Sequence, residues 1–96
     1  MSNKNISSNK NSNEADYIEL GKFYFLNNKY DEAVSEFKKV LKINPSNAEA
    51  YYNIGLIKET ANLLEEAREM YSKALAINSD YKIARNRLNK LIGIRN

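Results

Sequence analysis

Apolar residues return every three or four positions from residue 14 onward, the spacing that places them on one face of an α-helix. One series contains Tyr17, Leu20 and Tyr24, and a second runs through residues 30–41. We predict two helices separated by Asn27-Asn28-Lys29, because asparagine tolerates the left-handed backbone that a tight turn needs. The second helix should end before Pro45, since proline cannot continue a helix.

The same pattern occurs a second time, 34 residues further along the chain. Nine of 34 aligned positions are identical, including those of the turn asparagines Asn28 and Asn62, and conservative pairs such as Phe37 with Tyr71 fill several gaps. The identical pairs are Tyr17/Tyr51, Gly21/Gly55, Asn28/Asn62, Glu32/Glu66, Ala33/Ala67, Lys39/Lys73, Leu41/Leu75, Ile43/Ile77 and Asn44/Asn78. Such a period indicates two copies of one helix–turn–helix unit.

The helix that opens the second copy has a candidate start signal. Ser46 stands three residues before Glu49, the spacing of a capping box, and Asn47 is a competing N-cap. After the second copy, a fifth helix is predicted over residues 80–94. It has a single apolar face, as expected of a helix that caps a repeat array, and this face consists of Ala84, Leu88, Leu91 and Ile92.

The chain therefore divides into four segments. Residues 1–13 are almost entirely Asn, Ser and Lys and should form a disordered tail, because such a composition cannot bury enough surface to offset the entropy of ordering. The two repeats occupy residues 14–47 and 48–81, and the capping helix occupies residues 82–96.

The composition argues against an enzyme. The chain has no cysteine and no histidine, so the commonest nucleophile, general base and metal ligands are missing. The acidic runs near Asp31 and Glu65 lie in first turns of helices, where carboxylates favour the helix dipole, and need no metal. We expect no catalytic, cofactor or metal site. The sequence has no apolar stretch for a membrane span or signal peptide, so we expect a cytoplasmic protein.

The net charge of +3 is unevenly distributed along the chain. Residues 48–81 carry three basic and six acidic side chains, whereas residues 82–96 carry five basic side chains and no acid. A basic terminal segment can bind nucleic acid or can simply be the solvated face of a helix. The acidic second repeat argues against nucleic acid, which is the least favoured alternative.

The 34-residue unit resembles the tetratricopeptide repeat family. On the first helix, Tyr17, Leu20, Gly21 and Tyr24 match the family's large, aliphatic, glycine and aromatic positions, and Tyr51, Ile54 and Gly55 repeat them. On the second helix, the matches are Ala33, Phe37, Val40 and Pro45 in the first copy and Ala67, Tyr71 and Ala74 in the second. Lys58 and Ser79 depart from the aromatic and the proline. The resemblance implies an all-α, right-handed α-solenoid of two hairpins with a capping helix.

Glycine within a helix costs about 1 kcal/mol relative to alanine, so Gly21 and Gly55 require a structural reason. We expect the paired helix to approach them closely, at Ala33 in the first repeat and at Ala67 in the second.

The resemblance further implies a non-catalytic module or scaffold for protein–protein interaction. In this family the first helices line a concave groove that holds a peptide or a partner helix. Carried over by register, the groove residues are Ile18, Glu19, Lys22, Phe25, Leu26, Glu49, Tyr52, Asn53, Leu56, Glu59, Ile83, Asn86, Arg87 and Lys90. The principal candidates among them are Ile18, Lys22, Phe25, Leu26, Tyr52, Asn53, Leu56 and Arg87. Two alternatives remain: these side chains pack against one another within the chain, or the unit associates with itself.

One subset of the family clamps the C-terminal carboxylate of heat-shock chaperones with lysine, arginine and asparagine side chains. Only Asn53 and Arg87 match that set here. Ile18, Lys22 and Ile83 stand where the clamp has lysine, asparagine and lysine, so we predict that this chain does not form the clamp.

Overall fold

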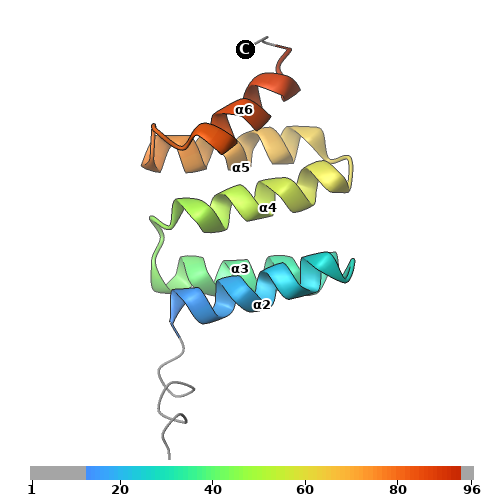
Figure 1. Cartoon of the computed structure of the whole chain (residues 1–96), viewed down its shortest axis with the longest axis vertical. Helices are drawn as coiled ribbons and strands as arrows, with labels where there is room; N and C mark the ends of the chain where they lie inside the picture. Colours follow the sequence, from blue (N-terminus) through green and yellow to red (C-terminus); the bar gives the residue numbers. More distant parts are fainter. Residues whose placement is uncertain (1–12, 94–96) are drawn as a thin grey trace, which may run out of the picture. The chain divides into compact units, whose positions relative to one another are not determined.

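The computed structural model describes residues 13–93, which form five helices and no strand. They are α2 (Glu14–Leu26), α3 (Tyr30–Ile43), α4 (Ala48–Thr60), α5 (Leu64–Ile77) and α6 (Lys82–Leu91), as Figure 1 shows. The predicted all-α helical-repeat fold is confirmed. The chain divides between Pro45 and Ser46 into two compact units, one with α2 and α3 and the other with α4 to α6. None of these helices is long and apolar enough to cross a membrane.

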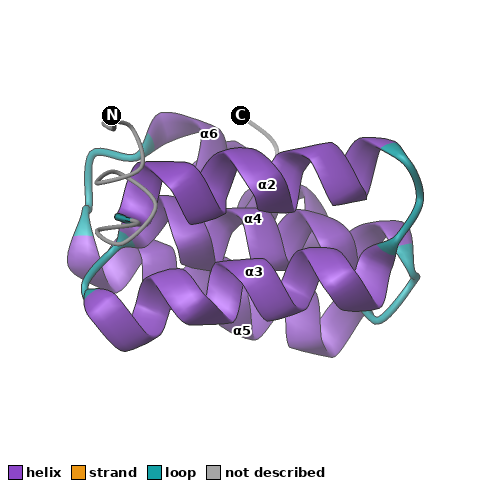
Figure 2. Ribbon diagram, turned by 90° about the horizontal axis from the view of Figure 1, so that it is seen from below, coloured by secondary structure: helices purple, strands orange, loops and turns teal. Residues whose placement is uncertain are grey.

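The first unit is an antiparallel hairpin of α2 and α3, which lie side by side (Figure 2). Asn28 has the predicted left-handed conformation, with φ of 62°, at the turn between the two helices. Asn13, which the sequence analysis placed in the tail, is the N-cap of α2: its side chain accepts a hydrogen bond from the Asp16 amide, and the Asp16 carboxylate accepts one from the Asn13 amide. Residues 1–12 of the predicted tail lie outside the described residues.

The two helices of the first unit meet where Gly21 faces the ring of Phe37. A Cβ atom built on Gly21 would lie 2.7 Å from that ring, closer than such atoms approach in proteins. Our expectation that Ala33 makes this approach was wrong, although the helix pair was right. The glycine is required because Phe37, which is fully buried, fills the space that a side chain would occupy.

The second unit repeats this design in α4 and α5. A Cβ atom on Gly55 would lie 2.6 Å from Tyr71, so here too the aromatic ring and not Ala67 makes the approach. Asn62 adopts the left-handed turn conformation, with φ of 64°, as predicted. Of the two candidate N-caps, Asn47 directly precedes α4, and its side chain accepts a hydrogen bond from the Ala50 amide at 2.9 Å.

A lysine on the second helix lies over a tyrosine ring of the first helix in both hairpins. The Lys39 ammonium is 5.4 Å from the centre of the Tyr17 ring, and the Lys73 ammonium is 5.7 Å from that of Tyr51. Both distances are within the range of cation–π attraction. Two of the identical pairs in the duplication therefore preserve one interhelix contact.

Helix α6 packs on α5, as predicted for a cap. Ala84 is fully buried, and Leu88 and Leu91 pack against the core of the second unit. The helix begins at Lys82, two residues later than predicted, and ends at Leu91, so Ile92 lies just beyond its last turn.

Tyr52 packs against two other tyrosine rings, at tilted angles, in the core of the second unit. The Tyr52 ring lies 5.8 Å from that of Tyr71 and 5.4 Å from that of Tyr81, which immediately precedes α6. Burial, followed by the negative charge of Glu49, raises the pKa of Tyr81 to about 12. Tyr81 therefore stabilises the fold in its neutral form.

Replacing Gly21 with alanine should destabilise the protein by about 1–3 kcal/mol, because the new methyl group would collide with the buried Phe37 ring. Urea unfolding followed by circular dichroism measures this loss. In a Phe37→Leu background the ring is absent, so Gly21→Ala should cost much less or become stabilising through its helix propensity. An equal cost in both backgrounds would show that the contact does not select glycine.

Stability should fall as the pH rises through the range from about 10 to about 12. The pKa of Tyr81 is higher in the folded than in the unfolded chain. The contribution of this residue to stability is therefore complete below about pH 10 and is lost as Tyr81 ionises in the folded protein as well. The Tyr81→Phe variant should lose stability less steeply over this range, as urea titrations at successive pH values would reveal. Parallel curves for the two proteins would contradict the assignment.

Candidate partner-binding surfaces

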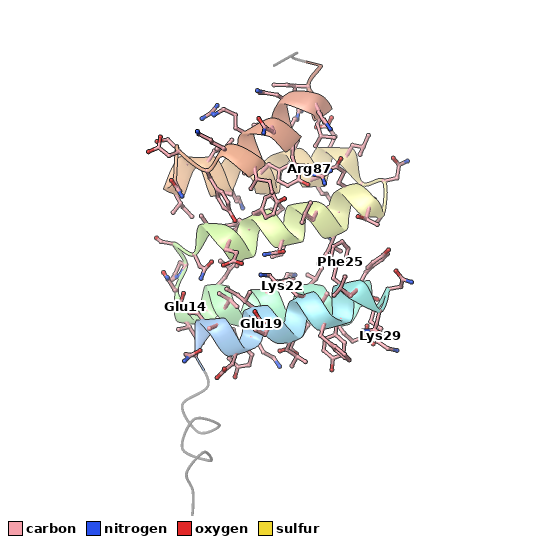
Figure 3. All side chains as sticks on the ribbon, viewed as in Figure 1. Glu14, Glu19, Lys22, Phe25, Lys29 and Arg87 are labelled. Atoms are coloured by element: carbon pink, nitrogen blue, oxygen red, sulfur yellow. The ribbon has the colours of Figure 1, made fainter. Side chains whose placement is uncertain are left out.

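The predicted groove residues of the first unit lie along one side of α2, but they differ in exposure. Ile18 is 7% exposed and belongs to the core, whereas Lys22 and Phe25 are half-buried. Leu26 is 81% exposed, the largest value among the described large apolar side chains. Figure 3 shows Lys22 and Phe25 projecting from the same edge of α2. The side chains on this edge that a partner can reach are therefore Lys22, Phe25 and Leu26.

The Phe25 ring packs against another aromatic ring of the same hairpin. Its ring centre lies 5.8 Å from that of Tyr30, the first residue of α3. One side of the ring is thus supported, while the half-buried residue keeps part of its surface in solvent. A rigid aromatic ring beside an exposed leucine is suited to apolar contacts, since little side-chain entropy is lost on binding.

Most of the predicted groove residues of the second unit make contacts within that unit. Tyr52 is 7% exposed because its ring packs against those of Tyr71 and Tyr81. Asn53 is 6% exposed, and its amide donates to the Glu49 backbone carbonyl at 2.8 Å. Leu56 is half-buried and packs against the core. Tyr52 and Leu56 therefore pack within the chain, which was one of the two alternatives to partner binding.

Arg87 and Glu59, both expected in the groove, interact with each other. The Arg87 guanidinium lies 3.6 Å from one Glu59 carboxylate oxygen, and the Tyr71 hydroxyl donates to the other at 2.7 Å. Burial and this hydrogen bond raise the pKa of Tyr71 far above its usual range, so the hydroxyl stays protonated. These three side chains connect α4, α5 and α6. Their interaction could not be predicted from the sequence, because no spacing rule joins residues so far apart.

Acidic side chains of α5 are paired with cations. In α5, Glu65 contacts Arg68 at 2.6 Å, and Glu66 contacts Lys58 of α4 at 3.0 Å. Lys58 stands at the position of Tyr24 in the first repeat, so an ion pair replaces an aromatic contact there. Residues 13–93 contain no cluster of three acidic side chains with metal-site geometry.

Comparison with known proteins supports the repeat assignment. A family profile described as "TPR repeat" matches residues 21–60, and one described as "Tetratricopeptide repeat" matches residues 48–81. The peroxisomal targeting signal receptor of Candida albicans is 32% identical over 84 residues, which are 86% of this chain and 14% of the receptor. The uncharacterized protein ycf37 of Guillardia theta is 34% identical over 77 residues, 80% of this chain and 43% of that protein. This chain thus spans less than half the length of either relative.

Solved structures of the same architecture are similar to this chain. The first TPR of Spaghetti (RPAP3), bound to the HSP90 peptide SRMEEVD, matches with a TM-score of 0.77 and 26% identity over 84% of this chain and 64% of that chain. One structure of MamA matches with a TM-score of 0.77 and 23% identity, over 88% of this chain and 48% of that one. The duplicated hairpin, the matching profiles and these structures show that the chain belongs to the tetratricopeptide repeat family, whose members are generally non-catalytic protein–protein interaction modules.

Proposed function

We propose that this chain binds a peptide or a helix of a partner protein in the concave groove typical of its family, with Lys22, Phe25 and Leu26 as its principal contacts. The observation that carries the proposal is the exposure of Leu26, 81%, beside a Phe25 ring that is already held in place by Tyr30. An exposed leucine beside a half-buried aromatic ring that is held in place favours a ligand with apolar side chains.

The ligand is not a C-terminal carboxylate held in the chaperone clamp. Arg87, one of the two matching residues, is already paired with Glu59, and Asn53 uses its amide within α4. A carboxylate ligand would have to share the Arg87 guanidinium with Glu59, whose negative charge would repel it. The peptide in the RPAP3 structure is therefore a negative control for this chain, although that protein supports peptide recognition by the same fold.

The double substitution Phe25→Ala and Leu26→Ala should weaken partner binding by about tenfold or more, because both apolar contacts would be lost. The partner is first identified by affinity capture from a lysate of the source cell and mass spectrometry, and its affinity for purified wild type and variant is then measured. The Ile43→Ala variant is the control, since Ile43 is a 49% exposed apolar residue on α3.

All variants must show the same helicity by circular dichroism. Partner binding that survives the Phe25/Leu26 substitution, or that is weakened equally by Ile43→Ala, would contradict the proposal. Tight binding of the SRMEEVD peptide would contradict our prediction that this chain does not form the clamp.

Self-association is a second candidate, favoured by a different side of α2. Leu20 is 39% and Phe23 is 58% exposed, whereas the equivalent residues of the second repeat, Ile54 and Ile57, are 3% and 2% exposed. The same two apolar positions are thus buried in the second repeat and exposed in the first. In an antiparallel pair of α2 helices, Leu20 of each copy would pack on Phe23 of the other.

If the chain pairs in this way, sedimentation equilibrium should give the mass of a dimer, and Phe23→Glu should reduce it to that of a monomer. A glutamate at the interface would be buried without a partner charge. The control is Leu64→Glu, which places the same charge at a 45% exposed apolar position of α5. A monomeric wild-type protein would exclude this candidate.

A further inference from the structure

The second unit contains a cleft of about 630 Å³ between α5 and α6. Leu88 of α6 and Ile92, just beyond the last turn of that helix, form its apolar side. The lining from α5 consists of Glu65, Glu66, Arg68, Glu69 and Ser72. None of these residues belongs to the predicted groove. We infer that this α5–α6 cleft is a second binding site, and that it takes a basic amphipathic segment of a partner protein.

The register of the repeat explains why an apolar surface is open at this position. Leu88 aligns with Leu20 and Ile54, and Asn89 aligns with Gly21 and Gly55, so α6 corresponds to the first helix of a hairpin. In both complete hairpins, the second helix packs an aromatic ring on that glycine. Within residues 13–93, α6 has no such second helix, and Ile92 remains 42% exposed. The cleft therefore has room for a segment that runs along α6.

The charges that line the cleft indicate which segment fits. Three carboxylates and one guanidinium give the lining a net charge of −2. The side chains of Glu65, Glu66 and Glu69 are 84%, 53% and 63% exposed, so their pairs with neighbouring cations are individually weak. Although α6 is rich in lysine and arginine, it contributes only Leu88 to the lining, and Ile92 follows just beyond the helix. Lysine or arginine on the bound segment would thus face carboxylates, while its apolar side chains cover Leu88 and Ile92.

The repeat register at Asn89, which does not itself line the cleft, indicates which apolar side chains can pack along α6. At Gly21 and Gly55, even a methyl group would lie 2.6 to 2.7 Å from the aromatic ring of the second helix. Because α6 carries asparagine there, a bound segment cannot seat an aromatic ring as Phe37 and Tyr71 do. The segment should instead place aliphatic residues, such as leucine, on Leu88 and Ile92.

Fluorescence anisotropy with a labelled leucine–lysine helical peptide, LKKLLKLLKKLLKL, tests the inference. The full chain should bind it, and the double substitution Glu65→Lys and Glu66→Lys should weaken binding by about tenfold or more. The matched control is Asp31→Lys with Glu32→Lys, which makes the same change in charge at the equivalent positions of the first repeat. The control should retain near wild-type affinity.

Further variants separate this site from other surfaces. Ile92→Ser should weaken binding about threefold or more by removing apolar contact, and Phe25→Ala with Leu26→Ala should leave it unchanged. Amide chemical-shift changes on peptide addition should concentrate at Ser72, Leu88 and Ile92. Equal weakening by the two charge reversals would overturn the inference, because it would indicate only attraction by overall charge. Equally tight binding of the acidic counterpart, LEELLELLEELLEL, would also overturn it.

Discussion

The contact of an aromatic ring with a helical glycine determines the geometry of both hairpins. Phe37 on Gly21 and Tyr71 on Gly55 bring the paired helices so close that no other residue fits at the glycine position. At that separation, alanines such as Ala33 and Ala67 become fully buried. The turn asparagines and the lysine–tyrosine contacts then fall at equivalent places in the two units. The loss of helix propensity at each glycine is offset by the burial of a whole aromatic side chain.

Much of the fold could be predicted because its determinants are local or repeat at a fixed period. Asn28 and Asn62 marked both turns correctly, since a left-handed residue between helices is a requirement of the backbone itself. Local rules were less successful where two candidates competed. Ser46 has the capping-box spacing, but Asn47 lies one residue closer to the helix and caps it. The partner of each glycine was also misassigned, because sequence shows that space is needed but not which side chain fills it.

The exposure of the candidate groove residues could be predicted only in part. The repeat register predicted that Phe25, Leu26 and Tyr52 lie in the groove. Phe25 and Leu26 have surface in solvent, whereas Tyr52 is 7% exposed. Tyr52 is covered because Tyr81, 29 positions later, packs on it, and no spacing rule describes that contact. Likewise, Glu59 stands where the first repeat has Phe25, so one repeat uses this position for an aromatic contact and the other for the interaction with Arg87 and Tyr71. The repeat preserves its packing residues, whereas the remaining positions acquire separate roles.

The weak start of α6 has a consequence for the dynamics of the second unit. Its N-cap, Tyr81, makes no side-chain hydrogen bond to the helix, and its first turn contains Lys82 but no acid. The exposed amides and the helix dipole there are thus poorly compensated, and α6 depends on Ala84, its leucines and Arg87 to stay in place. Local opening should cost less free energy in α6 than in α4 or α5, so its amide hydrogens would exchange with solvent first. Each opening would briefly expose the rings of Tyr52 and Tyr71, and α6 would behave as a reversible cover over the aromatic core of the second unit.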